Sequence, residues 1–154
     1  MSIRTLQPER LWKEFYEICQ IPHPSKKEEK MIAYLQEFGK RHNLETRTDA
    51  AGNVLICKPA TPGYENRKKV ILQSHMDMVC EKNNDTQHNF DTDPIQPYID
   101  GEWVKAKGTT LGADNGIGMA TELAILASND LKHPALECLF TVDEETGLTG
   151  AFAI

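Results

Sequence analysis

The sequence predicts an α/β fold in which helices cover a mixed, largely parallel sheet. Between residues 70 and 142, a strand-like apolar run, a segment with apolar residues at helical spacing and a second strand-like run follow one another, which implies a βαβ unit. The composition agrees with such a domain, since 40% of the 154 residues are hydrophobic and 26% are charged. A chain of this length can bury a substantial core within one domain.

Two amphipathic helices are expected before the first strands. Pro8 opens a helix that ends near residues 19–20, where a proline-containing segment breaks it. Ser25 and Glu28 have the spacing of a capping box ahead of the second helix, and Asn43 closes that helix. The apolar stripes consist of Leu11, Phe15 and Ile18 in the first helix and of Met31, Ile32, Leu35 and Phe38 in the second. Such stripes are packing surfaces.

Short β-branched and aliphatic runs predict the strands. Residues 46–48 and 54–57 read as two strands joined by a turn at 49–53 that ends in Gly-Asn. Residues 70–72 read as a short buried strand. The Asp-Gly pair at 100–101 lies between apolar pairs and is a strong hairpin signal.

The last third of the chain alternates helix and strand. A glycine-rich segment at 112–118 precedes a helix that ends near Asn129, and Pro134 confirms the break. The apolar residues of that helix are Met119, Leu123, Ile125 and Leu126. Residues 136–142 form the next apolar strand.

Charge and cysteine usage exclude several classes of function. Because 17 Lys and Arg face 23 Asp and Glu, the formal net charge is -6, which favours neither nucleic acid nor an anionic membrane as a partner. No apolar run is long enough to cross a bilayer, and the first residues are polar, so we expect a cytosolic protein. The four cysteines are scattered without a Cys-x-x-Cys pair, which argues against a thiolate metal site.

Residues with metal-binding chemistry stand at the ends of three predicted elements. His75 and Asp77 follow an apolar strand, Asp114 begins a helix, and Glu144 and Glu145 follow the next strand. A His-x-Asp pair suits zinc because the imidazole coordinates through one nitrogen while a carboxylate orients its other N–H. Each feature alone has a simpler explanation, namely a polar strand end, a helix N-cap and a solvated turn. Their convergence at the strand ends, where open α/β sheets bind ligands, favours a site.

Together these residues offer parts of a dinuclear zinc hydrolase. Such an enzyme needs a carboxylate that bridges two metals, further His and carboxylate ligands, and a base for the water. Asp114 is the natural bridge because its two oxygens can address both metals. Glu144 and Glu145 are consecutive, so one can ligate while the other faces the water. The glycines within 112–118 permit the close backbone turns that such a ligand requires.

Three longer segments carry a resemblance to a known family: residues 75–83 (HMDMVCEKN), 108–118 (GTTLGADNGIG) and 143–148 (DEETGL). They resemble the N-terminal part of the aminoacyl-histidine dipeptidases. These form the peptidase D or carnosinase-like branch of the dinuclear zinc peptidases, which also include glutamate carboxypeptidases, tripeptidases and aminoacylases. The resemblance covers nearly the whole chain, and residues 80–83 point to the dipeptidase branch.

The resemblance implies a role for each candidate residue. His75 would be a ligand of one zinc, Asp77 its orienting carboxylate, Asp114 the bridge, Glu144 the general base and Glu145 a ligand of the other zinc. The implied reaction is hydrolysis of small dipeptides of the Xaa-His, carnosine-like kind by zinc-activated water. Two zinc ions would serve the complete enzyme, with cobalt or manganese as substitutes. The resemblance also implies a cis peptide after Asp114.

Members of that family are much longer than this chain. They supply a further carboxylate ligand, a distant histidine ligand and an inserted dimerisation domain. We therefore expect residues 1–154 to be the N-terminal part of a zinc-peptidase catalytic domain, inactive alone, without the inserted domain and the C-terminal part of the catalytic domain. The complete enzyme is expected to be a homodimer. Two alternatives stay open, another amidohydrolase such as an aminoacylase or tripeptidase, and a non-catalytic binding module on a peptidase fold.

Overall fold

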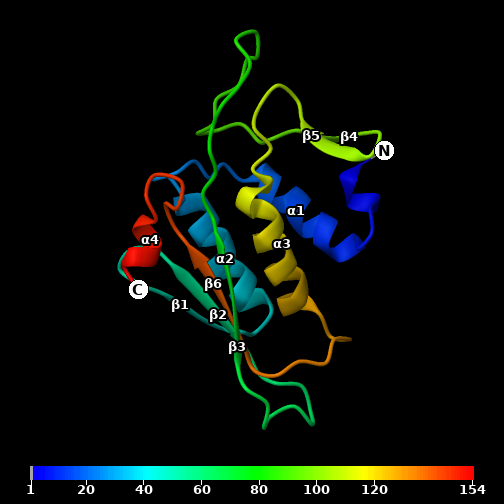
Figure 1. Ribbon diagram of the computed structural model, residues 1–154, viewed down its shortest axis with the longest axis vertical. Helices are drawn as coiled ribbons and strands as arrows, with labels where there is room; N and C mark the ends of the chain where they lie inside the picture. The colour runs from blue at the N-terminus through cyan, green and yellow to red at the C-terminus, as the bar shows by residue number, and fades with distance from the viewer. Residues whose placement is uncertain (1) are drawn as a thin grey trace.

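A computed structural model describes residues 2–154 and arranges them in two sheets and their helices (Figure 1). The strands are β1 (Glu45–Thr48), β2 (Val54–Lys58), β3 (Val70–His75), β4 (Pro97–Asp100), β5 (Trp103–Ala106) and β6 (Leu136–Thr141). The helices are the 3-10 helix η1 (Ile3–Thr5) and the α-helices α1 (Glu9–Gln20), α2 (Glu29–Arg41), α3 (Ala113–Ala127) and α4 (Thr149–Phe152). The predicted helices, the β1–β2 pair and the 100–101 hairpin are therefore present.

The main sheet has the strand order β1-β2-β6-β3 and is mixed, which confirms the predicted α/β class. The parallel share is smaller than expected, because β3 and β6 are parallel whereas β1–β2 and β2–β6 are antiparallel. The cause is connectivity. A tight turn can join only antiparallel strands, as it does for β1 and β2, whereas the crossover through α3 returns the chain parallel to β3.

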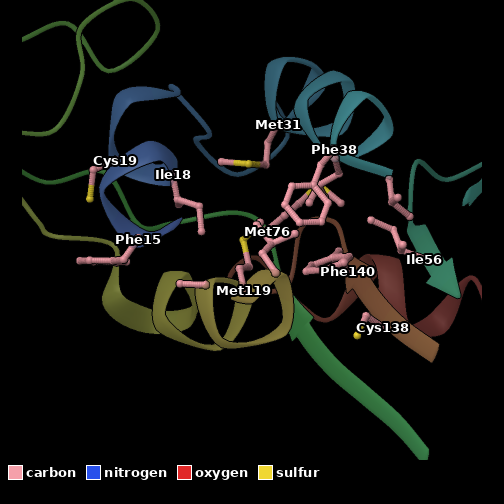
Figure 2. Close-up of a cluster of buried hydrophobic side chains, with 14 of the residues drawn as sticks. Phe15, Ile18, Cys19, Met31, Phe38, Ile56, Met76, Met119, Cys138 and Phe140 are labelled. Carbon is pink, nitrogen blue, oxygen red and sulfur yellow. The ribbon is translucent and has the colours of Figure 1, made fainter. Parts of the chain in front are cut away.

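The core lies between one face of this sheet and the helices. The inward residues of β2 and β6 are Val54, Ile56, Cys138 and Phe140, all fully buried. Figure 2 shows Phe140 in one buried cluster with Phe38 from α2 and Met119 from α3. Burial of these side chains stabilises the fold in rough proportion to the apolar area removed from water. The core thus fixes the position of α3 against the sheet.

Strand β3 departs from the sequence prediction. It was expected to be buried, but it is the edge strand of the four-stranded sheet, and Val70 and Ile71 are 41% and 61% exposed. Only the end of β3 is enclosed, where Ser74 and His75 are buried. An apolar run of this length indicates a strand but cannot show whether a further strand or a helix covers it.

The predicted capping box at the start of α2 is wrong. The helix begins at Glu29, so Glu28 is its N-cap, and Glu28 makes no side-chain cap hydrogen bond. Ser25 instead donates to Asp77 Oδ2 at 2.7 Å, and Glu28 Oε1 accepts the Asp143 N–H at 2.8 Å. A turn closed by the Lys27 N–H and the Pro24 carbonyl holds Ser25 outside the helix, and Glu28 directly precedes its first residue. Both side chains therefore serve tertiary contacts.

No helix within residues 2–154 combines the length and the apolar character needed to cross a membrane.

Candidate metal centre

The carboxyl ends of β3 and β6 lie side by side at one edge of the sheet. His75 pairs with Thr141 in the parallel register, so the residues that follow each strand leave the sheet together. Helix α3 connects β3 to β6, and the first turn of α3 brings Asp114 back to His75. Polar groups distant in sequence therefore converge where open sheets bind ligands.

His75 is the centre of this cluster and is 6% exposed. Its Nδ1 lies 3.1 Å from Asp77 Oδ1, and its Nε2 lies 2.9 Å from Asp114 Oδ1. Glu144 Oε2 is 3.8 Å from the same Nε2. Since Asp77 engages Nδ1, Nε2 is the nitrogen that faces the carboxylates and can serve as a metal ligand.

Asp114 projects from an irregular first turn of α3. Its φ and ψ of -91° and 105° are not helical, and the peptide bond to Asn115 is cis, as the resemblance implied. Gly112 precedes it in the left-handed region at φ 74°, where a Cβ would come within 2.9 Å of Met78 Sδ. The carboxylate is 85% exposed, so it is accessible to a ligand from solvent.

Three donors converge tightly enough to hold an ion. One ligand atom each from His75, Asp114 and Glu145 lies within 4.8 Å of the others. One imidazole nitrogen and two carboxylates are a donor set that zinc accepts in catalytic sites, so these residues fit a zinc ion. Glu144 stands beside them with its side chain 34% exposed. The structure thus brings together all five residues singled out in the sequence.

Asp77 is the buried anchor of the centre, with 1% exposure. Its Oδ1 accepts the Glu144 N–H at 2.9 Å, and its Oδ2 accepts the Glu145 N–H at 3.2 Å as well as the Ser25 hydroxyl. Burial alone would raise the pKa of Asp77, but these hydrogen bonds and the one from His75 outweigh it and hold the pKa well below its ordinary value. Asp77 is therefore ionised and joins β3 to the turn after β6.

The charges around His75 and Glu145 shift both groups. Burial lowers the pKa of His75, but hydrogen bonds to Asp77 and Asp114 outweigh it and raise the pKa to about 9. Desolvation raises the pKa of Glu145, and although His75 opposes this shift, the negative charges of Asp114 and Glu144 add to it. Such concentrated negative charge around one imidazole favours a cation.

Sequence reasoning missed two contributors to the site, the half-buried Ser25 and the buried Glu28. Their spacing is that of a local cap, and this pattern hid their contacts with Asp77 and with the Asp143 N–H. The proline-flanked segment before them carries His23, which is 3% exposed and whose carbonyl accepts the Met78 N–H at 3.2 Å. No periodicity signal could have placed this segment beside the strand end.

The sequence model of Peptidase family M20/M25/M40 matches residues 71–154, which include all five site residues. The chain belongs to this family. Family M20/M25/M40 is metal-dependent, in agreement with the donor cluster around His75.

Individual relatives in this family are peptidases. The chain is 58% identical over 153 residues to the cytosol non-specific dipeptidase of Escherichia coli (strain K12), covering 99% of this chain and 32% of that protein. It matches the crystal structure of an aminoacylhistidine dipeptidase from Vibrio alginolyticus with a TM-score of 0.98 and 59% identity, over 100% of this chain and 31% of that one. A Staphylococcus aureus tripeptidase structure follows at TM-score 0.77 and 25% identity, over 97% of this chain and 40% of that one. The chain thus spans about a third of the length of the two dipeptidases.

Proposed function

We propose that this chain carries the first part of the active centre of a zinc-dependent dipeptidase that hydrolyses Xaa-His dipeptides of the carnosine kind. The observation that supports this most is the convergence of His75, Asp114 and Glu145 within 4.8 Å, with Glu144 beside them. The names of two similar proteins support dipeptides as substrates, and the name of the Vibrio alginolyticus protein supports a C-terminal histidine. The name of the E. coli protein supports a cytosolic location, and the resemblance supports a homodimer of the complete enzyme.

His75, Asp114 and Glu145 would hold the metal, with Asp114 shared between two ions. Bound zinc, or cobalt or manganese in its place, supplies Lewis-acid polarisation of the peptide carbonyl and lowers the pKa of water. With Asp114 shared, each ion would have two ligands from residues 2–154, whereas catalytic zinc sites usually have three protein ligands and water. We therefore infer weak zinc binding and little turnover for the 154-residue chain alone.

Asp77 and Glu144 have the remaining roles, in positioning and in proton transfer. Asp77 fixes the orientation of His75 through Nδ1 and holds the backbone of Glu144 and Glu145 in place. Glu144 would act as general base, taking a proton from water and passing it to the leaving amine. Its partly exposed carboxylate, 3.8 Å from His75 Nε2, lies close enough to the donor cluster for this role.

A paired substitution tests the proposal in a form that spans the full length of the dipeptidase relatives. Glu144→Gln should lower turnover of Xaa-His dipeptides by about a hundredfold or more while zinc content stays close to that of the wild type, because proton transfer is lost and ligation is not. Glu145→Gln is the matched control and should lose zinc. Equal zinc loss in both variants would contradict the roles, and an inactive wild type would contradict the function.

A second candidate is a tripeptidase, which the similarity to the Staphylococcus aureus structure supports. An aminoacylase is the other amidohydrolase in question. Assaying the same full-length form against Xaa-His dipeptides, other dipeptides, tripeptides and N-acyl amino acids separates them. A binding module on a peptidase fold would bind such ligands without turnover, and replacing Glu144 would then leave its behaviour unchanged.

A further inference from the structure

The turn that carries Glu144 and Glu145 is held by side chains from other parts of the chain. Four consecutive backbone N–H groups, from Val142 to Glu145, donate to side-chain oxygens. Their acceptors are Asn53 for Val142, Glu28 for Asp143, and Asp77 for Glu144 and Glu145. Each acceptor residue is 6% exposed or less, so water competes little for these bonds.

Asn53 differs from the other two acceptor residues because its side chain bonds to the backbone at both ends of residues 142–150. Its Oδ1 accepts the Val142 N–H at 3.0 Å, and its Nδ2 donates to the Gly150 carbonyl at 2.9 Å. The Gly150 N–H also donates to the Val142 carbonyl at 3.1 Å, which closes the segment into a loop. We call residues 142–150 the carboxylate loop, since Glu144 and Glu145 lie within it.

Where Val142 and Gly150 meet, the two ends of the carboxylate loop leave no room for a side chain at position 150. A Cβ on Gly150 would lie 2.3 Å from the Val142 carbonyl oxygen and 2.6 Å from Asn53 Oδ1. The glycine therefore allows the backbone to approach the Asn53 amide directly. Figure 1 shows α4, which contains Gly150, beside the end of the sheet where β1 turns into β2.

Asn53 is itself locked in place by the turn that precedes β2. Asp49 Oδ1 accepts the N–H groups of Ala51, Gly52 and Asn53, each at 2.9 Å. Asp49 Oδ2 accepts from Asn53 Nδ2 at 2.8 Å, so this nitrogen serves two acceptors. The Gly150 carbonyl and the Asp49 carboxylate both need a donor at Nδ2, and the Val142 N–H needs an acceptor at Oδ1. Among side chains of this size, only an amide supplies both a donor and an acceptor in this way.

We infer that Asn53 is a positioning residue for the proposed reaction, acting on Glu144 and Glu145 through the carboxylate loop. By joining Val142 to Gly150, it fixes the path of the backbone between them, and Asp77 then sets the two glutamates against His75. The inference rests on the proposed function for its effect on turnover. Its structural part, the order of the carboxylate loop, does not depend on that function.

Amide hydrogen exchange of the 154-residue chain tests the structural part directly. Asn53→Ala removes both hydrogen bonds to the carboxylate loop, and we expect the Glu144 and Glu145 amides to exchange at least about tenfold faster than in the wild type. Asn53→Asp keeps an acceptor for the Val142 N–H but sets a carboxylate against the Gly150 carbonyl and Asp49. In this variant the Val142 amide should stay protected from exchange, whereas the Glu144 and Glu145 amides should exchange faster than in the wild type.

The matched control is Ile56→Val, which shortens a fully buried side chain of β2, the strand after Asn53, and removes no hydrogen bond to the carboxylate loop. Conditions are chosen well below the thermal midpoints of all variants, so that global unfolding does not contribute. Exchange at the two glutamates should then match the wild type in Ile56→Val. Equal exchange in Asn53→Ala and Ile56→Val would overturn the inference.

Kinetics of the full-length form test the effect on turnover. Asn53→Ala should lower kcat by roughly 10- to 100-fold and leave KM within about threefold, because displaced carboxylates weaken the chemical step more than substrate binding. A kcat equal to that of Ile56→Val would overturn the positioning role. If the wild type hydrolyses no peptide, the proposed function fails, whereas the exchange experiment still decides whether Asn53 orders the carboxylate loop.

Discussion

Two buried carboxylates of this protein, Asp77 and Glu122, have pKa values that are shifted in opposite directions. Both are nearly inaccessible, with exposures of 1% and 4%. Asp77 has a pKa well below its ordinary value, whereas burial raises the pKa of Glu122 to about 7. Asp77 receives hydrogen bonds from a hydroxyl, an imidazole and two backbone amides, while the Ser74 hydroxyl and the Cys138 thiol beside Glu122 lower its pKa less than burial raises it.

The difference follows from where each group lies in the fold. Asp77 stands beyond the end of β3, where the turn after β6 has backbone N–H groups that no ladder uses. Glu122 lies in the middle of α3 against Ser74 of β3 and Cys138 of β6, where helix and sheet already use the backbone donors. Burial therefore neutralises a carboxylate within the layers and keeps it charged at their edge, where donors are free.

The largest expected effect is the loss of the Asp77 carboxylate. Asp77→Ala should lower the free energy of unfolding by about 3 to 5 kcal/mol, since it leaves a buried imidazole and two amide donors without their acceptor. Urea unfolding at pH 7 measures the change. The control is Asp85→Ala, which removes an exposed carboxylate from a loop. Equal stabilities for the two variants would mean that Asp77 does not anchor the turn.

Glu122→Gln should raise the free energy of unfolding above about pH 5, whereas Asp77→Ala lowers it. The unfolded carboxyl ionises near its ordinary value of 4.5, but the folded one holds its proton until about pH 7. Between these values the folded state binds more protons, so wild-type stability falls as pH rises, by on the order of 3 kcal/mol in total. The variant should match the wild type at pH 4 and exceed it at pH 8.

Urea unfolding across this range, with the exposed Glu37→Gln as control, checks the Glu122 prediction. The control should keep the wild-type fall in stability above pH 5. A Glu122→Gln variant with the same fall would show that another group causes it.

The smallest effects come from two serines that face these carboxylates. Ser25 donates to the ionised Asp77 at 2.7 Å, whereas Ser74 lies against Glu122, whose carboxyl is held partly neutral at pH 7 by burial. Ser25→Ala should therefore cost about 1 to 2 kcal/mol, and Ser74→Ala less, because a hydrogen bond to a charged group stabilises more than one to a neutral group. Thermal unfolding at pH 7 compares the two variants. A larger loss of stability in Ser74→Ala than in Ser25→Ala would contradict the difference between the sheet edge and the interior.

Much of the fold and of the site could be predicted without coordinates. The spacing of Leu11, Phe15 and Ile18 gave the first helix, and the turn residues at 49–53 gave the first strand pair. All five site residues were identified because they are residue types with metal chemistry at element ends, and the structure brings them together at one sheet edge. Their roles in zinc binding and catalysis stay proposals.

The sequence by itself determined where the three longer helices, the strands and the turns between paired strands lie, because periodicity, turn chemistry and residue type are local properties. The tertiary structure alone decided that β3 is an exposed edge and that Ser25 and Glu28 leave the expected cap. The partners of Ser25, Glu28 and Asn53 lie 52, 115 and 97 positions away. Bonds of that span depend on how the layers pack, and a local pattern such as a capping box competes with them for the same side chains.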